Sequence, residues 1–133
     1  MTENRGSHPT GSVHPLALEQ IERLGFRFDG LRSKSWFDFA RPDAPRMDFI
    51  ITVCDSAAGE ACPHWPGHPT TAHWGYQDPA QVTGSDDDKR AAFHLVFKQI
   101  RKRVDQFVAL PIEWMDDDTV RREAVRAVAA IKL

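Results

Sequence analysis

The sequence predicts an α/β fold with a parallel sheet, and two features of the chain carry that prediction. Residues 49–54, FIITVC, form a continuous run rich in β-branched side chains, which is typical of a strand buried on both faces. Longer segments with apolar residues at helical spacing stand on both sides of that run, and helices that alternate with short strands favour a parallel sheet. With 133 residues the chain fits a single domain, residues 1–133.

The N-terminal part is expected to be an irregular lead-in followed by a helix. Residues 1–14 contain glycine, proline, serine and threonine without apolar periodicity, which is typical of irregular backbone. Pro15 suits the first position of a helix. The apolar face that follows stops at Gly25, which fits the left-handed position just beyond a helix end.

A short amphipathic helix and a second strand are expected before and after the first strand. The helix covers residues 33–40, with Ser33 or Ser35 as its cap and Pro42 as its breaker. Residues 71–74 are the second strand candidate, and the Pro- and Gly-rich stretch between the strands is expected to be a loop. Two strands alone make a marginal sheet, so either the sequence pattern misses further strands or part of the architecture is absent.

Two helices are expected to close the chain. Three acidic residues at 86–88 favour the start of a long helix over about residues 87–109, which Pro111 ends. Its apolar face is expected to hold Ala92, Phe93, Val96, Phe97, Ile100, Val104, Phe107 and Val108. Its solvated face is expected to hold Lys98, Arg101, Lys102 and Arg103. A final amphipathic helix at about residues 117–132 belongs to a C-terminal helical extension, residues 112–133.

Composition and charge exclude several classes of function. Lys and Arg total 17 against 19 Asp and Glu, for a formal charge of -2, so no positive field favours nucleic acid or an anionic membrane. No apolar run approaches the roughly 18 residues of a membrane span, and the N-terminus lacks the apolar core of a signal peptide. We therefore expect a cytoplasmic protein without a nucleic-acid or membrane partner, and nothing in the sequence indicates a cofactor.

Cys54 and Cys62 are the two cysteines of the chain, eight residues apart. In a reducing compartment such a pair is expected to be free thiols, metal ligands or a catalytic disulfide rather than a structural staple. Cys54 lies where the strand ends, the usual place for reactive groups in open parallel sheets, although a buried inert cysteine fits the same position. Cys62 can also be interpreted as an exposed thiol that has no function. A disulfide between the two would close a small ring, open to a thioredoxin-like reductant.

Other roles remain open for these residues. The two thiols and three histidines can be interpreted as a zinc site, although the C-x7-C-x-H spacing matches no compact zinc module; the donors are Cys54, Cys62, His64, His68 and His73. Two thiols are also soft ligands suited to arsenite, a binding role that needs no catalysis. Asp78 precedes Pro79, and an Asp-Pro pair commonly starts a turn.

Four segments of the chain, in order, resemble the thiol-dependent arsenate reductases built on the low-molecular-weight tyrosine phosphatase fold. They are GSHPTGSVHP at residues 6–15, GLRSKSW at 30–36, VCDSAAGEACP at 53–63 and TAHWG at 71–75. The resemblance extends to about Pro111. It implies a three-layer α/β fold and the reduction of arsenate to arsenite with electrons from thiols.

The resemblance also implies roles for three residues. In the family a cysteine of an N-terminal loop attacks arsenate, a second cysteine attacks the adduct to release arsenite, and a third forms a disulfide with the second. Cys54 is similar in position to the second cysteine, Cys62 to the third, and Asp78 to the acid that protonates the departing oxygen. The implied partners are arsenate, arsenite and a reductant, either thioredoxin or glutaredoxin.

The chain departs from the family before Gly6. The family has there a strand, a C-x5-R loop with its helix and a second strand, and the 133 residues contain no C-x5-R loop. Because that loop supplies the nucleophile and binds the oxyanion, we expect an N-terminally truncated fold that is inactive alone. The open sheet edge is expected to allow self-association. The alternative function is a non-catalytic thiol-based protein that binds arsenite or senses redox state.

Overall fold

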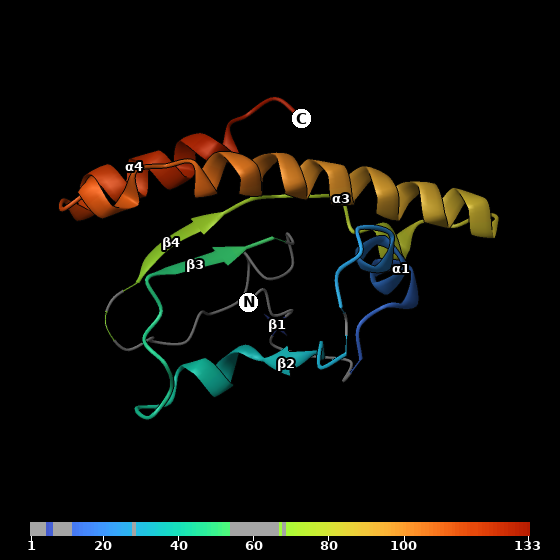
Figure 1. Cartoon of the computed structure of the whole chain (residues 1–133), viewed down its shortest axis with the longest axis horizontal. Helices are drawn as coiled ribbons and strands as arrows, with labels where there is room; N and C mark the ends of the chain where they lie inside the picture. Colours follow the sequence, from blue (N-terminus) through green and yellow to red (C-terminus); the bar gives the residue numbers. More distant parts are fainter. Residues whose placement is uncertain (1–4, 7–11, 28, 54–66, 68) are drawn as a thin grey trace.

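A computed structural model of the chain describes residues 5–6, 12–27, 29–53, 67 and 69–133, which form three α-helices and two small sheets. The long helix α3 (Asp86–Val108) runs along one side of the molecule (Figure 1). Helix α1 (Pro15–Arg23) packs against the N-terminal half of α3, and α4 (Asp118–Ala129) packs beside its C-terminal half and on the sheet. The predicted α/β class is confirmed.

The larger sheet pairs β3 (Phe49–Thr52) with β4 (Thr70–His73). The strands are parallel, with Phe49 opposite Thr70 and Thr52 opposite His73, so the predicted parallel pairing is confirmed. All four residues of β3 are half-buried, whereas the sequence predicted burial on both faces. That prediction was wrong: Phe49 and Ile51 pack against the core, whereas Ile50, on the opposite face, is not among the residues packed there.

The second sheet pairs β1 (Arg5–Gly6) with β2 (Lys34–Ser35), again in parallel. It corrects two predictions, because the sequence placed β1 in an irregular lead-in and β2 in a helix. Each strand has two residues, too few for alternation to be visible in the sequence. The predicted helix is reduced to a single 3-10 turn, η1 (Trp36–Phe39), capped by the Ser35 hydroxyl, which accepts a hydrogen bond from the Phe37 amide at 3.3 Å.

The ends of the α-helices follow from local chemistry. Pro15 occupies the first turn of α1, as predicted, and the His14 ring caps that helix by accepting a hydrogen bond from the Leu16 amide at 3.1 Å. Gly25 follows α1 with a φ of 77°, the left-handed conformation expected of it. The start of α3 is a capping box between Ser85 and Asp88, in which each side chain accepts from the other residue's amide at 3.1 Å.

Helix α4 starts one residue after Asp117, whose carboxylate accepts a hydrogen bond from the Thr119 amide at 2.7 Å. A short 3-10 helix, η3 (Ile112–Trp114), separates it from α3. Both C-terminal helices therefore lie close to the predicted ranges. None of the helices in the described part is long and apolar enough to cross a membrane.

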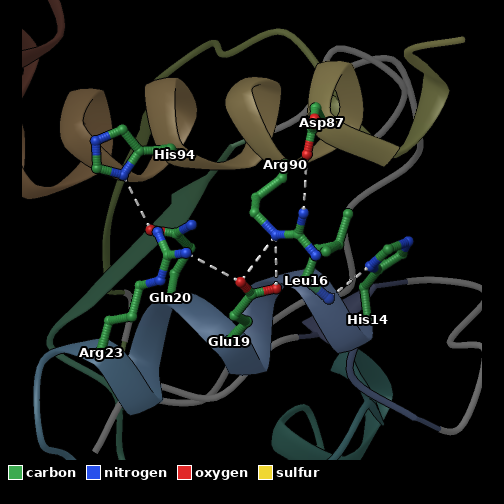
Figure 2. Close-up of polar contacts among 8 residues, drawn as sticks. All are labelled: His14, Leu16, Glu19, Gln20, Arg23, Asp87, Arg90 and His94. Atoms are coloured by element: carbon green, nitrogen blue, oxygen red, sulfur yellow. Dashed lines mark hydrogen bonds and ion pairs between the residues drawn. The ribbon is translucent and has the colours of Figure 1, made fainter. Parts of the chain in front are cut away.

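Polar side chains connect α1 and α3 (Figure 2). The Arg90 guanidinium donates from Nε to both carboxylate oxygens of Glu19, at 2.9 and 3.2 Å. His94 Nδ1 lies 3.1 Å from Oε1 of Gln20, a side chain that is 4% exposed. Directional contacts of this kind fix the register of the two helices more than they stabilise the fold, because exposed ion pairs contribute little free energy.

The hydrophobic core lies between the sheet and α4. Its buried members are Trp74, which follows β4, and Val125 and Val128 of α4. The Phe107 ring of α3 meets the Trp74 ring edge to face, with centroids 5.8 Å apart, and the Phe49 ring in the same way at 5.2 Å. The core thus anchors the carboxyl end of β4, where the candidate site begins.

Candidate functional site

The carboxyl ends of β3 and β4 point to the same edge of the sheet, as their arrowheads show in Figure 1. The chain that leaves β4 stays beside β3, because the Trp74 amide donates to the Thr52 carbonyl at 2.8 Å and the Tyr76 amide donates to the Val53 carbonyl at 3.3 Å. Functional groups of open parallel sheets gather at this edge. Cys54 comes directly after Val53 in the sequence.

Asp78 lies on this edge segment, two residues beyond Tyr76. It is exposed, and its Oδ1 atom accepts a hydrogen bond from the Ala80 amide at 3.0 Å, which caps the 3-10 helix η2 (Pro79–Gln81). The turn expected of an Asp-Pro pair is therefore present. Its Oδ2 atom makes no hydrogen bond to the described residues, so one carboxylate oxygen is open to solvent or to a bound molecule.

Cys54 and Cys62 lie outside the described residues, and their pairing and roles stay predictions. The same holds for His64 and His68 of the possible zinc site. His73, the described member of that set, lies with Nδ1 at 2.7 Å from Oγ1 of Thr52, so this nitrogen is engaged with its strand neighbour. No group of three metal-binding side chains occurs within the described ranges.

Arg103 of α3 holds the edge segment from the helical side, a role that the sequence did not indicate. The solvated position predicted for it was wrong: the side chain is 6% exposed. Its guanidinium donates to the Gly75 carbonyl and to the Ala129 carbonyl, each at 3.0 Å, and lies over the Tyr76 ring, 4.7 Å from the centroid. Burial raises the pKa of the Tyr76 phenol, and the Arg103 charge opposes that rise.

The spacing of residues along α3 holds a signal for the buried arginine. Arg103 is seven residues after the buried Val96 and four before the core residue Phe107, so it falls on the stripe that faces the sheet. Conversely, Val104 and Val108 were assigned to the apolar face, and they are 41% and 70% exposed. The prediction gave more weight to the charge of Arg103 than to its place on the helix. Its place on the helix determines that it is buried.

A cavity of about 310 Å³ lies between the first turn of α1, the segment that starts with η2 and the first turns of α3. The His14 ring stacks on Phe93 at its wall, with centroids 4.5 Å apart, and Lys89 brings a cationic side chain. The remaining wall is made of Leu16 and the loop residues Pro79, Ala80, Gln81, Val82, Thr83 and Gly84. The cavity therefore begins at Pro79, the residue after Asp78, and Asp78 itself is not one of its lining residues.

Comparison with known families shows to which family the chain belongs. Residues 3–124 match the sequence profile described as low molecular weight phosphotyrosine protein phosphatase. The chain belongs to this family. The matched range includes both strands of the larger sheet, β3 and β4.

Several curated relatives carry the name arsenate reductase. The chain is 39% identical over 95 residues to that of Halalkalibacterium halodurans, 37% over 96 residues to that of Bacillus licheniformis, and 38% over 96 residues to that of Bacillus subtilis. Each match covers 71% of this chain and 66% of the relative. The chain therefore spans slightly less than two thirds of the length of these relatives.

Proposed function

We propose that this chain takes part in the reduction of arsenate to arsenite with thiol electrons, with Cys54 and Cys62 as the pair that ends oxidised and Asp78 as the acid. The observation that carries the proposal is the similarity to proteins named arsenate reductase, at 37–39% identity. The geometry of the edge supports it, because Val53, which precedes Cys54, is hydrogen-bonded to the segment that bears Asp78.

The proposed relay balances as follows. A first thiolate attacks arsenate and forms a sulfur–arsenic bond, and Asp78 gives the proton with which the departing oxygen leaves as water. The Cys54 thiolate then attacks the first sulfur; the sulfur–arsenic bond breaks, its electron pair stays on arsenic, and arsenite leaves. The Cys62 thiolate attacks Cys54, forms the Cys54–Cys62 disulfide and releases the first thiolate. A dithiol reductant of the thioredoxin or glutaredoxin class returns the disulfide to two thiols.

The first thiolate of this relay comes from outside residues 1–133, because the two cysteines of the chain hold the later positions. We propose that it is carried by a strand-loop-helix-strand segment with a C-x5-R loop. The same segment would supply a strand beside β3, whose second edge has no strand partner in the part of the chain that is described. Without it we expect the chain to self-associate through that edge. A cytoplasmic setting, where thiols are kept reduced, suits this chemistry.

The test is arsenate-dependent consumption of reduced thioredoxin by the chain mixed with, or fused to, a C-x5-R segment taken from one of its relatives. We expect turnover in the mixture and none with either part alone. Cys54→Ser and Cys62→Ser should each abolish steady-state turnover, since the relay cannot close without either thiol. Asp78→Asn should lower kcat by about a hundredfold or more, the range of a general acid.

Asp105→Asn is the matched control for Asp78→Asn, because Asp105 is an exposed carboxylate on α3. It should leave turnover unchanged. Turnover that survives Cys54→Ser would overturn the assigned relay. A mixture that shows no turnover while residues 1–133 bind arsenite through both thiols would favour the non-catalytic binding function instead.

A further inference from the structure

A buried arginine connects three parts of the molecule at the candidate site. Arg103 reaches from α3 to the carbonyl oxygen of Gly75 on the edge segment and to that of Ala129 in the last turn of α4. Its guanidinium carbon lies 4.7 Å from the centre of the Tyr76 ring. Gly75 and Tyr76 are the residues that carry the chain from β4 towards Asp78.

The partners of Arg103 are unusual for a buried charge. None of the ion pairs in the described part of the chain includes Arg103. Its charge is balanced instead by main-chain carbonyls, one of them at the negative end of α4, and by the face of an aromatic ring. A charge that is 6% exposed is costly unless such partners hold it, so the three contacts are coupled to one another.

We propose that Arg103 is a positioning residue for Asp78, which it holds in place by fastening residues 74–78 to α4 and to the face of α3. The assignment of Asp78 as the acid rests on the function proposed above; the fastening itself does not. The segment is then fixed at three points: Gly75 by Arg103, Tyr76 by the Val53 carbonyl, and Asp78 by its own cap on η2. Loss of the contact between Arg103 and Gly75 frees the stretch of chain that leads to Asp78.

Two substitutions separate the charge of Arg103 from its shape. Arg103→Lys keeps the charge but loses the planar fork that spans two carbonyls, and Arg103→Gln loses both. Arg101→Gln, two residues away on the exposed face of α3, is the matched control for the loss of a positive charge. Tyr76 is the single tyrosine of the chain, so its phenolate absorbance reports this site alone.

The first measurement is amide hydrogen exchange on the full chain. We expect exchange at the Tyr76 amide, which donates to the Val53 carbonyl, to be about tenfold faster or more in both Arg103 variants, the effect of losing charge-assisted hydrogen bonds, while the middle of α3 keeps its protection. Arg101→Gln should match the wild type. The absorbance titration should give a higher phenol pKa in Arg103→Gln and a value near wild type in Arg103→Lys, since lysine keeps the cation over the ring.

The second measurement is a double-substitution cycle in the reconstituted reductase. Arg103→Lys should lower kcat by about tenfold with the KM for arsenate unchanged, and it should have no further effect in the Asp78→Asn background. Unchanged exchange at the Tyr76 amide in a folded Arg103→Lys variant would overturn the fastening. Faster exchange with no effect on kcat would show that Arg103 fastens the segment, and it would refute the claim that Arg103 positions an acid. If Arg103→Gln fails to fold, Arg103→Lys alone decides both questions.

Discussion

The indole Nε1 of Trp74 donates a hydrogen bond to the main-chain carbonyl of Val125 at 3.2 Å, which joins the end of β4 to α4. Trp74 is 3% exposed and Val125 is 1% exposed, so this contact lies inside the core rather than at its rim. The Asp78 segment starts one residue beyond Trp74. A contact between two deeply buried residues is therefore also the base on which the candidate site is built.

Trp74→Ala should destabilise the fold by about 3–5 kcal/mol, because it removes a buried ring and leaves a cavity beside Phe107. Trp114→Ala is the control, since the Trp114 side chain is 83% exposed and its loss should change stability by less than about 0.5 kcal/mol. Urea unfolding followed by circular dichroism measures both. Equal losses in the two variants would contradict the position assigned to the core.

The sequence predicted the elements that have strong local signals. Pro15 and Gly25 at the ends of α1, the acidic start of α3 and the β-branched run of β3 each reflect a preference carried by a few adjacent residues. The strands β1 and β2 were not predicted, because a parallel pair of two-residue strands forms only through contacts between residues that are distant in the sequence.

The candidate site was predictable in part for the same reason. The Asp-Pro pair predicted the turn at Asp78, which the structure confirms, whereas the acid role of Asp78 was implied by the family resemblance and stays a prediction. Arg103 was assigned to solvent because its charge was weighed above its helical phase. That helical phase indicated its burial but not its partners, since Gly75, Tyr76 and Ala129 lie 26 to 28 residues away in the sequence.

The phenol of Tyr76 should make stability depend on alkaline pH. Burial holds its pKa in the folded state above the ordinary value of 10.0, so the folded protein keeps the proton after the unfolded chain has lost it. This contribution is present in full below pH 10 and is lost as pH rises through the folded-state pKa.

Tyr76→Phe removes that titration, so its urea midpoint should fall less between pH 9 and about pH 11 than that of the wild type. The lysines and the other groups titrate in both proteins and cancel in the comparison. Parallel pH profiles for the two proteins would show that the phenol has the same pKa folded and unfolded.

The Glu19–Arg90 pair should contribute little to stability despite its two short contacts. The side chains are 30% and 38% exposed, so solvent screens the interaction, and a double-mutant cycle of Glu19→Gln and Arg90→Gln should give a coupling energy below about 1 kcal/mol. The coupling should shrink further in 1 M salt. A coupling above about 2 kcal/mol that resists salt would show that this polar contact is a principal stabiliser of α1.

Mild oxidation should join Cys54 and Cys62 within one chain, and thioredoxin should reverse the reaction. The two thiols are eight residues apart, and the proposed relay requires them to meet. Thiol counting before and after oxidation, with peptide mass mapping, identifies the bridge. Two free thiols after oxidation, or bridges between chains only, would remove both residues from the relay.

The most direct test of the proposed function is a single turnover without reductant, in the chain combined with a C-x5-R segment. Arsenite released and Cys54–Cys62 disulfide formed are measured in the same sample after arsenate is added. The relay predicts one arsenite for each disulfide, since the two electrons that arsenic gains leave these two thiols. Arsenite formed without the disulfide, or the disulfide formed equally fast without arsenate, would contradict it.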